Sequence, residues 1–207
     1  MITISRLYDD YPAAARAYND LERAGISKSD LSIVANNGEG WYEHGLEPGR
    51  IDRDGDGIDD RREGADTGAA IGGTVGGVAG LLAGLGLLAI PGIGPIVAAG
   101  WLVSTAALGV AGGVTGGIIG AMTQSGVDED DAHAYAEGVR RGGTLITARV
   151  PDADRTRVEA ILDRGAVNIR QRRSMWEKSG WNRFDPNAPV YTADEIRRER
   201  ETYRARV

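Results

Sequence analysis

The sequence contains no cysteine, only two histidines and a single phenylalanine. Without cysteine the chain can form no disulfide and use no thiol chemistry, which fits a reducing compartment. The histidines, His44 and His133, are far apart and lack the spacing of a zinc site, so we expect ordinary surface or locally bonded side chains. The Gly72–Gly77 run lacks the lysine and the preceding strand of a phosphate loop, and no nucleophile motif is present. We therefore expect a protein that is not an enzyme.

A basic surface is also missing, because the chain carries a formal net charge of -6. Nucleic-acid binding requires a basic face that contacts phosphates, so we expect no nucleic-acid partner. Residues 1–7 lack the basic start and the long apolar run of a secretory signal peptide. We expect a cytoplasmic protein, and association with the inner membrane is an open alternative.

No charged residue occurs between Thr67 and Val127, and glycine recurs there at helical spacing. A helix with glycine at every fourth position has a stripe without side chains, which lets another backbone approach closely. Each interior glycine costs a helix about 0.5 to 1 kcal/mol relative to alanine, so we expect close packing to offset this cost. The expected packing positions are Gly68, Gly72, Gly76, Gly80, Gly84, Gly109, Gly112, Gly113, Gly116, Gly117 and Gly120.

Two prolines and two glycines between Ile90 and Ile96 predict that one helix stops and another starts, giving a helical hairpin. Each arm has about 20 residues or more, roughly 30 Å, enough to cross a bilayer. The hairpin therefore has two interpretations: it packs against sister subunits in a soluble homo-oligomer, or it inserts into a membrane. Flanking arginines such as Arg62 and Arg140 suit insertion, whereas the glycine and alanine content makes lipid transfer only modestly favourable. We favour self-assembly, with membrane association as the alternative.

The segments on either side of the uncharged stretch predict two β-α-β halves. Alternation predicts strands at residues 2–7 and 31–35, with a helix between them that Asp9 or Asp10 caps and Gly25 ends. Downstream, we expect a helix from Asp128 to Arg141, a strand at 144–150, a helix ending at Gly165 and a last strand at 166–170. Together they predict an α+β, split ferredoxin-like β-α-β/β-α-β domain with an inserted glycine-rich helical hairpin and a C-terminal helical arm. The predicted segments are 1–36, 37–66, 67–127, 128–170 and 171–207.

The segments Leu87–Pro95 and Tyr135–Leu145, with the half-domains around them, resemble the bacterial general stress protein family. In that family a ferredoxin-like domain is interrupted by a glycine-rich hydrophobic insertion. The resemblance implies stress-linked expression and no known catalytic activity, so it supplies no catalytic residues. The acidic segment before the insertion looks like an elaboration that many simpler members lack.

The sharpest chemical motif lies in that acidic segment, where residues 52–63 match a twelve-residue calcium loop with Gly57 at the turn. The expected metal ligands are Asp52, Asp54, Asp56, the Ile58 carbonyl, Asp60 and Glu63. Asp59 replaces the aliphatic residue of paired EF-hands, and residues 44–50 cannot form an incoming helix, so the loop resembles solitary calcium repeats of bacterial surface proteins. We expect a structural calcium ion that fixes the entry into the hairpin; the alternative is a solvated acidic turn.

The tail after Ile169 is rich in arginine, and Thr192–Glu195 is a capping box for a helix running to about Arg206. Because this helix is polar all round, we expect an arm that reaches a neighbouring subunit, with solvated charge as the alternative. The aromatic side chains near the insertion and in the tail fit plugs of grooves between subunits better than membrane anchors. They are Trp41, Tyr42, Trp176, Trp181, Phe184 and Tyr191.

Overall fold

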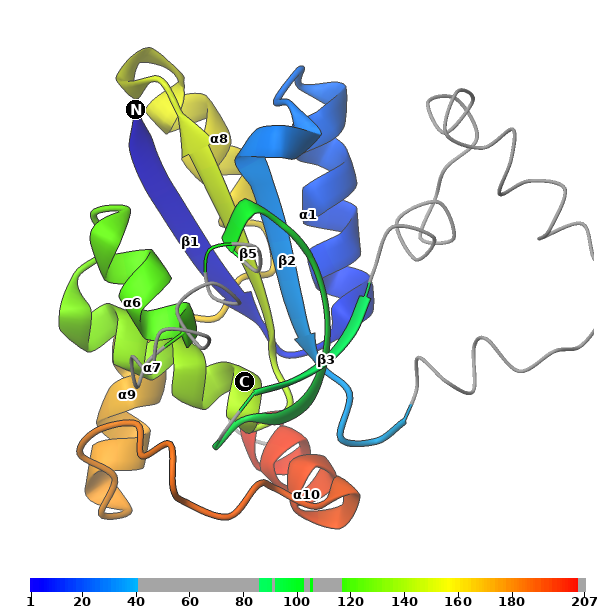
Figure 1. The fold of residues 1–207 in the computed structure, drawn as a ribbon, viewed down its shortest axis with the longest axis vertical. Helices are drawn as coiled ribbons and strands as arrows, with labels where there is room; N and C mark the ends of the chain where they lie inside the picture. Colours follow the sequence, from blue (N-terminus) through cyan, green and yellow to red (C-terminus); the bar gives the residue numbers. More distant parts are fainter. Residues whose placement is uncertain (41–85, 91, 103–104, 106–116, 205–207) are drawn as a thin grey trace, which may run out of the picture.

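The computed structural model describes residues 1–40, 86–90, 92–102, 105 and 117–204 (Figure 1). The described chain is a mixed α/β domain around an antiparallel five-stranded sheet of order β1-β5-β2-β4-β3. The strands are β1 (Ile2–Tyr8), β2 (Leu31–Asn36), β3 (Gly86–Ile90), β4 (Gly94–Gly100) and β5 (Thr144–Val150). The described α-helices are α1 (Tyr11–Arg23), α6 (Gly117–Gln124), α7 (Glu129–Arg140), α8 (Arg155–Leu162), α9 (Ile169–Lys178) and α10 (Ala193–Arg204).

The first half follows the local signals of the sequence. The Asp10 carboxylate accepts a hydrogen bond from the Ala13 amide at 2.8 Å and caps α1, and Gly25 ends the turn after it at φ +87°. Strands β1 and β2 each pair antiparallel with β5, so they run parallel to each other on its two sides. The predicted strand-helix-strand order of residues 1–36 is confirmed.

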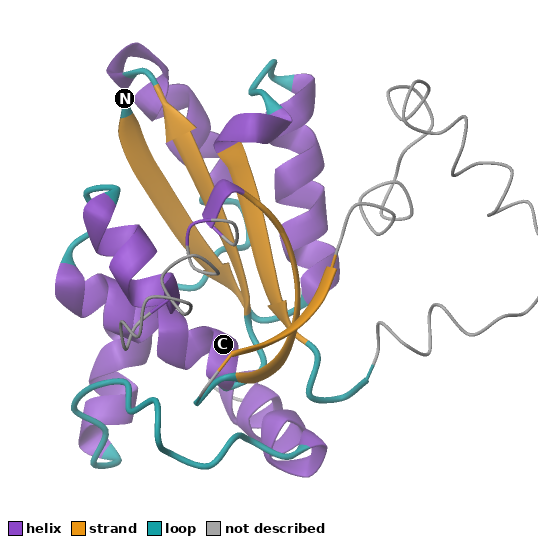
Figure 2. Ribbon diagram, in the orientation of Figure 1, coloured by secondary structure: helices purple, strands orange, loops and turns teal. Residues whose placement is uncertain are grey.

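Helices cover both faces of the sheet (Figures 1 and 2). On one face α1 and α8 pack on Ile33, Ile146 and Ala148, and on the other α6 and α7 pack on Val34 and Leu145. Successive strand residues point to opposite faces, and β2 and β5 are buried at nearly every position, so their apolar side chains supply both cores. The sheet is therefore the middle of three layers.

The predicted chain reversal between Ile90 and Ile96 is present, but the helical arms predicted on either side of it are wrong for residues 86–90 and 96–100, which are strands. Strands β3 and β4 pair in register from Gly86↔Ala98 to Ile90↔Gly94, and β4 pairs with β2. Gly92 and Gly94 form the turn at φ +73° and +97°, conformations that suit glycine. The backbone of β4 is hydrogen-bonded to β2. Glycine spacing within the stretch contains no information about such a distant partner, so it could not predict a strand. Of the remaining predicted hairpin, the structure describes only residues 92–93, 101–102, 105 and 117–127, the last range including α6.

The predicted last strand at 166–170 is also wrong. The Val167 amide donates to the Leu7 carbonyl at 2.7 Å, and the chain then leaves the sheet. The Asn168 side chain accepts from the Gln171 amide at 3.1 Å and so starts helix α9 at Ile169. A local cap, together with burial of Trp176 on this helix, outweighs the strand pattern of the preceding residues.

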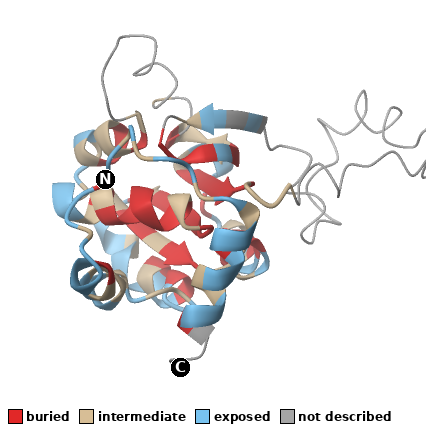
Figure 3. Ribbon diagram, turned by 90° about the horizontal axis from the view of Figure 1, so that it is seen from below, coloured by how far each residue is buried: buried red, intermediate tan, exposed pale blue. Residues whose placement is uncertain are grey.

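The tail packs on its own domain, which corrects the prediction of an arm reaching a neighbouring subunit. Trp176, Ile196 and Tyr203 are only 2%, 0% and 7% exposed, and Figure 3 shows the exposed outer surface of the helices beside the buried interior. The indole nitrogen of Trp176 donates to the Tyr203 hydroxyl at 2.7 Å, joining α9 to α10. The capping box is confirmed, because Glu195 accepts from the Thr192 amide at 2.8 Å. Two buried side chains, Ile196 and Tyr203, dock the otherwise polar helix α10.

Candidate functional site

Most of the predicted site residues lie outside the described part of the chain. This holds for the whole calcium loop, residues 52–63, and for all the packing glycines except Gly117 and Gly120. Within the described ranges, no group of three or more histidine, aspartate or glutamate side chains could hold a metal ion. No helix within those ranges has both the length and the apolar character needed to cross a membrane.

The two described packing glycines are on α6. This helix turns Ile118, Ala121 and Met122 into the core, while Gly117 and Gly120 are partly exposed. A Cβ placed on Gly120 would meet no atom within 4 Å. Helix α6 therefore offers open space beside a glycine backbone, which another helix could approach closely.

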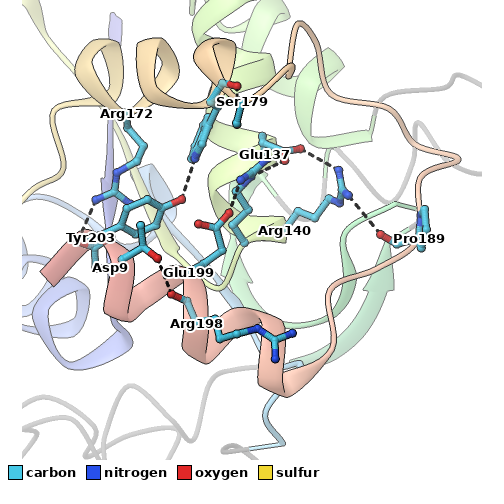
Figure 4. Close-up of polar contacts among 12 residues, drawn as sticks. Asp9, Glu137, Arg140, Arg172, Ser179, Pro189, Arg198, Glu199 and Tyr203 are labelled. Atoms are coloured by element: carbon cyan, nitrogen blue, oxygen red, sulfur yellow. Dashed lines mark hydrogen bonds and ion pairs between the residues drawn. The ribbon is translucent and has the colours of Figure 1, made fainter. Parts of the chain in front are cut away.

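A buried ion-pair cluster, which sequence reasoning missed, fastens the tail to α7 (Figure 4). Glu137 is fully buried and accepts from Arg140 Nη1 at 3.1 Å and from Arg141 Nε at 2.6 Å. Arg141 also pairs with Glu199 of α10. Burial lowers the pKa of Arg141, but the Glu137 carboxylate and its neighbours outweigh this and raise the pKa above its ordinary value. The i+3 and i+4 spacing of both arginines from Glu137 is the only sequence signal of this cluster.

Aromatic rings complete the same contact. Arg141 lies over the rings of Trp176 and Tyr191, with 5.0 and 5.4 Å from its guanidinium carbon to the ring centroids. Arg172 lies over Tyr203 and binds both carboxylate oxygens of Asp9, at 2.8 and 3.1 Å. Cation–π contacts and bidentate pairs hold these arginines in fixed positions.

These contacts correct part of the aromatic prediction, since Trp176 and Phe184 fill grooves within their own chain rather than between subunits. Trp41 and Tyr42 lie outside the described residues. The space left between α7, α9 and α10 is a cavity of about 10 Å³ lined by Arg141, Arg172 and Tyr203 among others. Such a volume holds at most one water molecule.

A larger hollow of about 420 Å³ lies beside the outer edge of β1, lined by Arg6, Asp131, Tyr135, Asp163 and residues 166–170. Its side chains are already engaged with one another. Arg6 pairs with Asp163 at 2.6 Å, and the Ser5 carbonyl accepts from the Tyr135 hydroxyl at 2.8 Å and from Arg6 Nη1 at 2.9 Å. Burial raises the pKa of Tyr135 to about 12, so its hydroxyl stays protonated as a donor at neutral pH.

The consequence for β1 is protection of its edge. The Ser5 carbonyl is covered by two side chains, and the neighbouring Leu7 carbonyl accepts from the Val167 amide. An edge strand whose outward acceptors are occupied cannot readily add another strand. These contacts therefore shield the edge of β1, and the described residues that line the hollow include no nucleophile paired with a base.

A second contact joins the tail to the uncharged stretch. Residues 181–191, called the strap below, connect α9 to α10 and cross the turn between β3 and β4. Phe184 of the strap is buried in the same apolar cluster as Ile93 of the turn. The strap is also fixed by Arg183, whose Nε donates to His133 Nε2 at 2.8 Å and which pairs with Glu129. His133 is thus bonded to a residue fifty positions later in the chain, and its side chain is 12% exposed.

No protein-family model, curated protein or solved structure matches this chain. The function must therefore be inferred from the residues and their arrangement alone.

Proposed function

We propose that this chain is a non-enzymatic, stress-associated bacterial protein that self-assembles through its uncharged glycine-rich stretch. The observation that carries the proposal is the glycine ladder between Thr67 and Val127, a stretch without one charged residue. Helix α6, near the end of this stretch, also supports the proposal. Gly120 faces open space, while Ile118 and Met122 pack in the core. Backbones that carry such stripes pack closely, and identical copies supply identical stripes.

The resemblance to bacterial general stress proteins is supported by the domain around the stretch. The order β1-β5-β2, with α1 and α8 on the same face, fits three strands and two helices of a split ferredoxin-like domain. The fourth strand of that arrangement has no counterpart in the described residues, where residues 166–168 make one backbone hydrogen bond to β1. We propose a split ferredoxin-like domain for this chain, and these five elements support the proposal.

Membrane insertion is the second candidate, favoured by the uncharged composition and the flanking arginines. A two-helix insertion requires its tip to reach the far side of the bilayer. The middle of the stretch instead pairs with the domain, because β4 is hydrogen-bonded to β2 from Ile96 to Gly100. This pairing favours self-assembly over two full membrane spans.

Sizing by light scattering without detergent, and fractionation with a carbonate wash, test the proposal. We expect a discrete soluble particle, and recovery of the chain in the washed membrane pellet would contradict it. In Gly120→Leu the new side chain enters open space in the monomer but blocks a close helix contact, so we expect a smaller particle. Glu201→Leu, which adds the same side chain at an exposed position of α10, is the control and should keep the wild-type size. If the particle size of Gly120→Leu equalled that of the wild type, α6 would not be part of the interface between subunits.

We further propose that calcium bound by residues 52–63 stabilises the entry into this stretch. The carboxylates of Asp54 and Glu63 stand at loop positions that bind calcium directly. Titration calorimetry should give a binding signal for the full chain that Asp54→Ala and Glu63→Ala each abolish. If no heat of binding were measured at millimolar calcium, the calcium site would be contradicted and residues 52–63 would be a solvated acidic turn.

A further inference from the structure

The strap covers the turn of hairpin β3–β4 at van der Waals distance. A Cβ placed on Gly92 would lie 2.6 Å from the Pro186 Cα, and one placed on Gly94 would lie 3.2 Å from Val190 Cγ1. Phe184 and Ile93 belong to one apolar cluster and are 8% and 2% exposed. The hairpin is thus held by β2 along one strand and by the strap across its turn.

The strap itself is held more weakly than the helices beside it. Phe184 is its one buried side chain, and Val190 is 45% exposed. At its two ends the strap is tied to the helices, because the Trp181 amide donates to the Trp176 carbonyl at 3.0 Å and the Tyr191 ring lies under Arg140 and Arg141. Between these ends its polar contacts to the other described residues are Arg183 with His133 and Glu129, and Arg140 Nη2 with the Pro189 carbonyl at 3.3 Å. The Arg183 and Glu129 side chains are 56% and 64% exposed, so water and salt weaken their attraction.

The flanking helices have independent anchors. Trp176 holds α9, while Ile196 and Tyr203 hold α10, and the buried Glu137 carboxylate binds Arg140 and Arg141 at the end of α7. Segments with few buried contacts open at lower free energy than the core. The strap can therefore open while α9 and α10 stay docked.

Opening would uncover an apolar surface that is already partly exposed. Leu87 of β3 is 47% exposed, and Ile93 lies at the turn under Phe184. The hairpin carries no charged residue that would keep it in water. Exposed apolar surface that extends over neighbouring residues is typical of association sites.

We propose that the strap is an autoinhibitory cover, latched by Arg183, whose opening exposes hairpin β3–β4 and so promotes association of the chain with a second copy. This inference rests on the proposed self-assembly. An arm that bridges subunits would promote association, whereas the strap opposes it. Removing the Arg183 latch should therefore increase association.

Hydrogen exchange measured by mass spectrometry on the full chain tests the latch. In Arg183→Gln, amides of residues 92–102 should exchange roughly two- to fivefold faster, the effect of losing an exposed ion pair, while α1 and β1 keep wild-type rates. Arg197→Gln is the matched control, because Arg197 is 54% exposed and pairs with Asp194 and Glu39 away from the turn. Phe184→Ala should increase exchange at 92–102 further. Wild-type exchange there in both Arg183→Gln and Phe184→Ala would overturn the proposal.

Light scattering on the same samples tests the consequence. Arg183→Gln should shift the distribution toward larger species at a given concentration, and Arg197→Gln should not. Faster exchange at 92–102 with an unchanged distribution would overturn the autoinhibitory role. If the wild-type chain and all variants were monomeric, the proposed self-assembly would fall, and exchange would still report whether Arg183 latches the strap.

Discussion

Pro186 lies against Gly92 so closely that no side chain fits between them: a Cβ on Gly92 would be 2.6 Å from the Pro186 Cα and 2.8 Å from its carbonyl carbon. One residue belongs to the uncharged stretch and the other to the tail. Their contact means that the insertion and the C-terminal segment form one packed unit with the sheet. Gly92 also has φ +73°, so its position requires glycine for two separate reasons.

We expect Gly92→Ala to destabilise the domain strongly. The left-handed conformation costs a residue with a Cβ about 1 to 2 kcal/mol, and displacing Pro186 adds an overpacking cost of about 1 to 3 kcal/mol. Gly180→Ala is the control, because Gly180 has φ +95° but nothing within 4 Å of an added Cβ. Urea unfolding should show a larger loss for Gly92→Ala. If both variants lost the same unfolding free energy, displacing Pro186 of the strap would cost no stability.

Alanine substitutions at two helical glycines distinguish the effect of packing on stability from the effect of helix propensity. Gly138 of α7 would place a Cβ 2.4 Å from Leu7 Cδ2, whereas Gly120 of α6 has open space. Alanine favours a helix by about 0.5 to 1 kcal/mol over glycine, so Gly120→Ala should stabilise the monomer. Gly138→Ala should destabilise it, because overpacking costs about 1 to 3 kcal/mol. Thermal unfolding followed by circular dichroism checks the two signs, and a gain in Gly138→Ala would contradict the packing of α7 on β1.

Glu137 should be among the most sensitive polar positions. Its replacement by glutamine leaves Arg140 and Arg141, each 12% exposed at the side chain, without their shared carboxylate. Breaking a buried ion pair costs about 3 to 5 kcal/mol, and we expect the lower end because Arg141 keeps Glu199. Glu177→Gln, at a carboxylate 45% exposed beside Arg173, should cost less than about 1 kcal/mol. Similar denaturation midpoints for the two variants would contradict the structural role of Glu137.

The stability of the chain should fall as pH decreases from neutrality through the histidine range. Burial and the Arg183 guanidinium lower the pKa of His133 below its ordinary 6.5, against the opposite effect of Glu129 and Asp130. The unfolded chain therefore takes up a proton first, and the stabilisation present above pH 6.5 is lost as pH falls toward the folded pKa. Protonation would also remove the acceptor for Arg183 Nε.

Urea unfolding at a series of pH values between 5 and 7.5 checks this dependence. His133→Gln keeps a polar side chain but cannot titrate, so its unfolding free energy should change less over this range. Asp and Glu ordinarily titrate near pH 4, below most of this window. Parallel pH profiles for wild type and His133→Gln would show that His133 makes no contribution.

Local signals in the sequence predicted the elements whose ends are capped by their own residues. Asp10, Asp128 and Thr192 each accept from an amide within three residues, and the helices begin where these residues indicate. Strand β5 was predicted with its observed bounds, Thr144–Val150, because β-branched and apolar residues fill it. Such signals are local and survive in any tertiary context.

Predictions that depended on distant partners failed. Residues 86–100 have the glycine content of the ladder around them, yet β4 pairs with β2, which is more than fifty residues earlier in the chain. The tail packs on the end of α7 through Glu199 and Arg141. The last predicted strand failed for a local reason, because the Asn168 cap starts α9 at Ile169. Of the candidate site, the sequence indicated the glycine ladder and the acidic loop, but neither the Glu137 cluster nor the strap.

The sequence by itself determined where helices begin, which strands alternate or run apolar, and that one long stretch carries no charge. Those properties follow from caps, side-chain periodicity and composition, all of which act over a few residues. Only the tertiary structure decided that β3 and β4 extend the sheet, that Glu137 is buried with two arginines, and that Pro186 covers Gly92. These outcomes depend on the free energy of burying surfaces and pairing backbone groups between segments far apart in the chain, which no local pattern encodes.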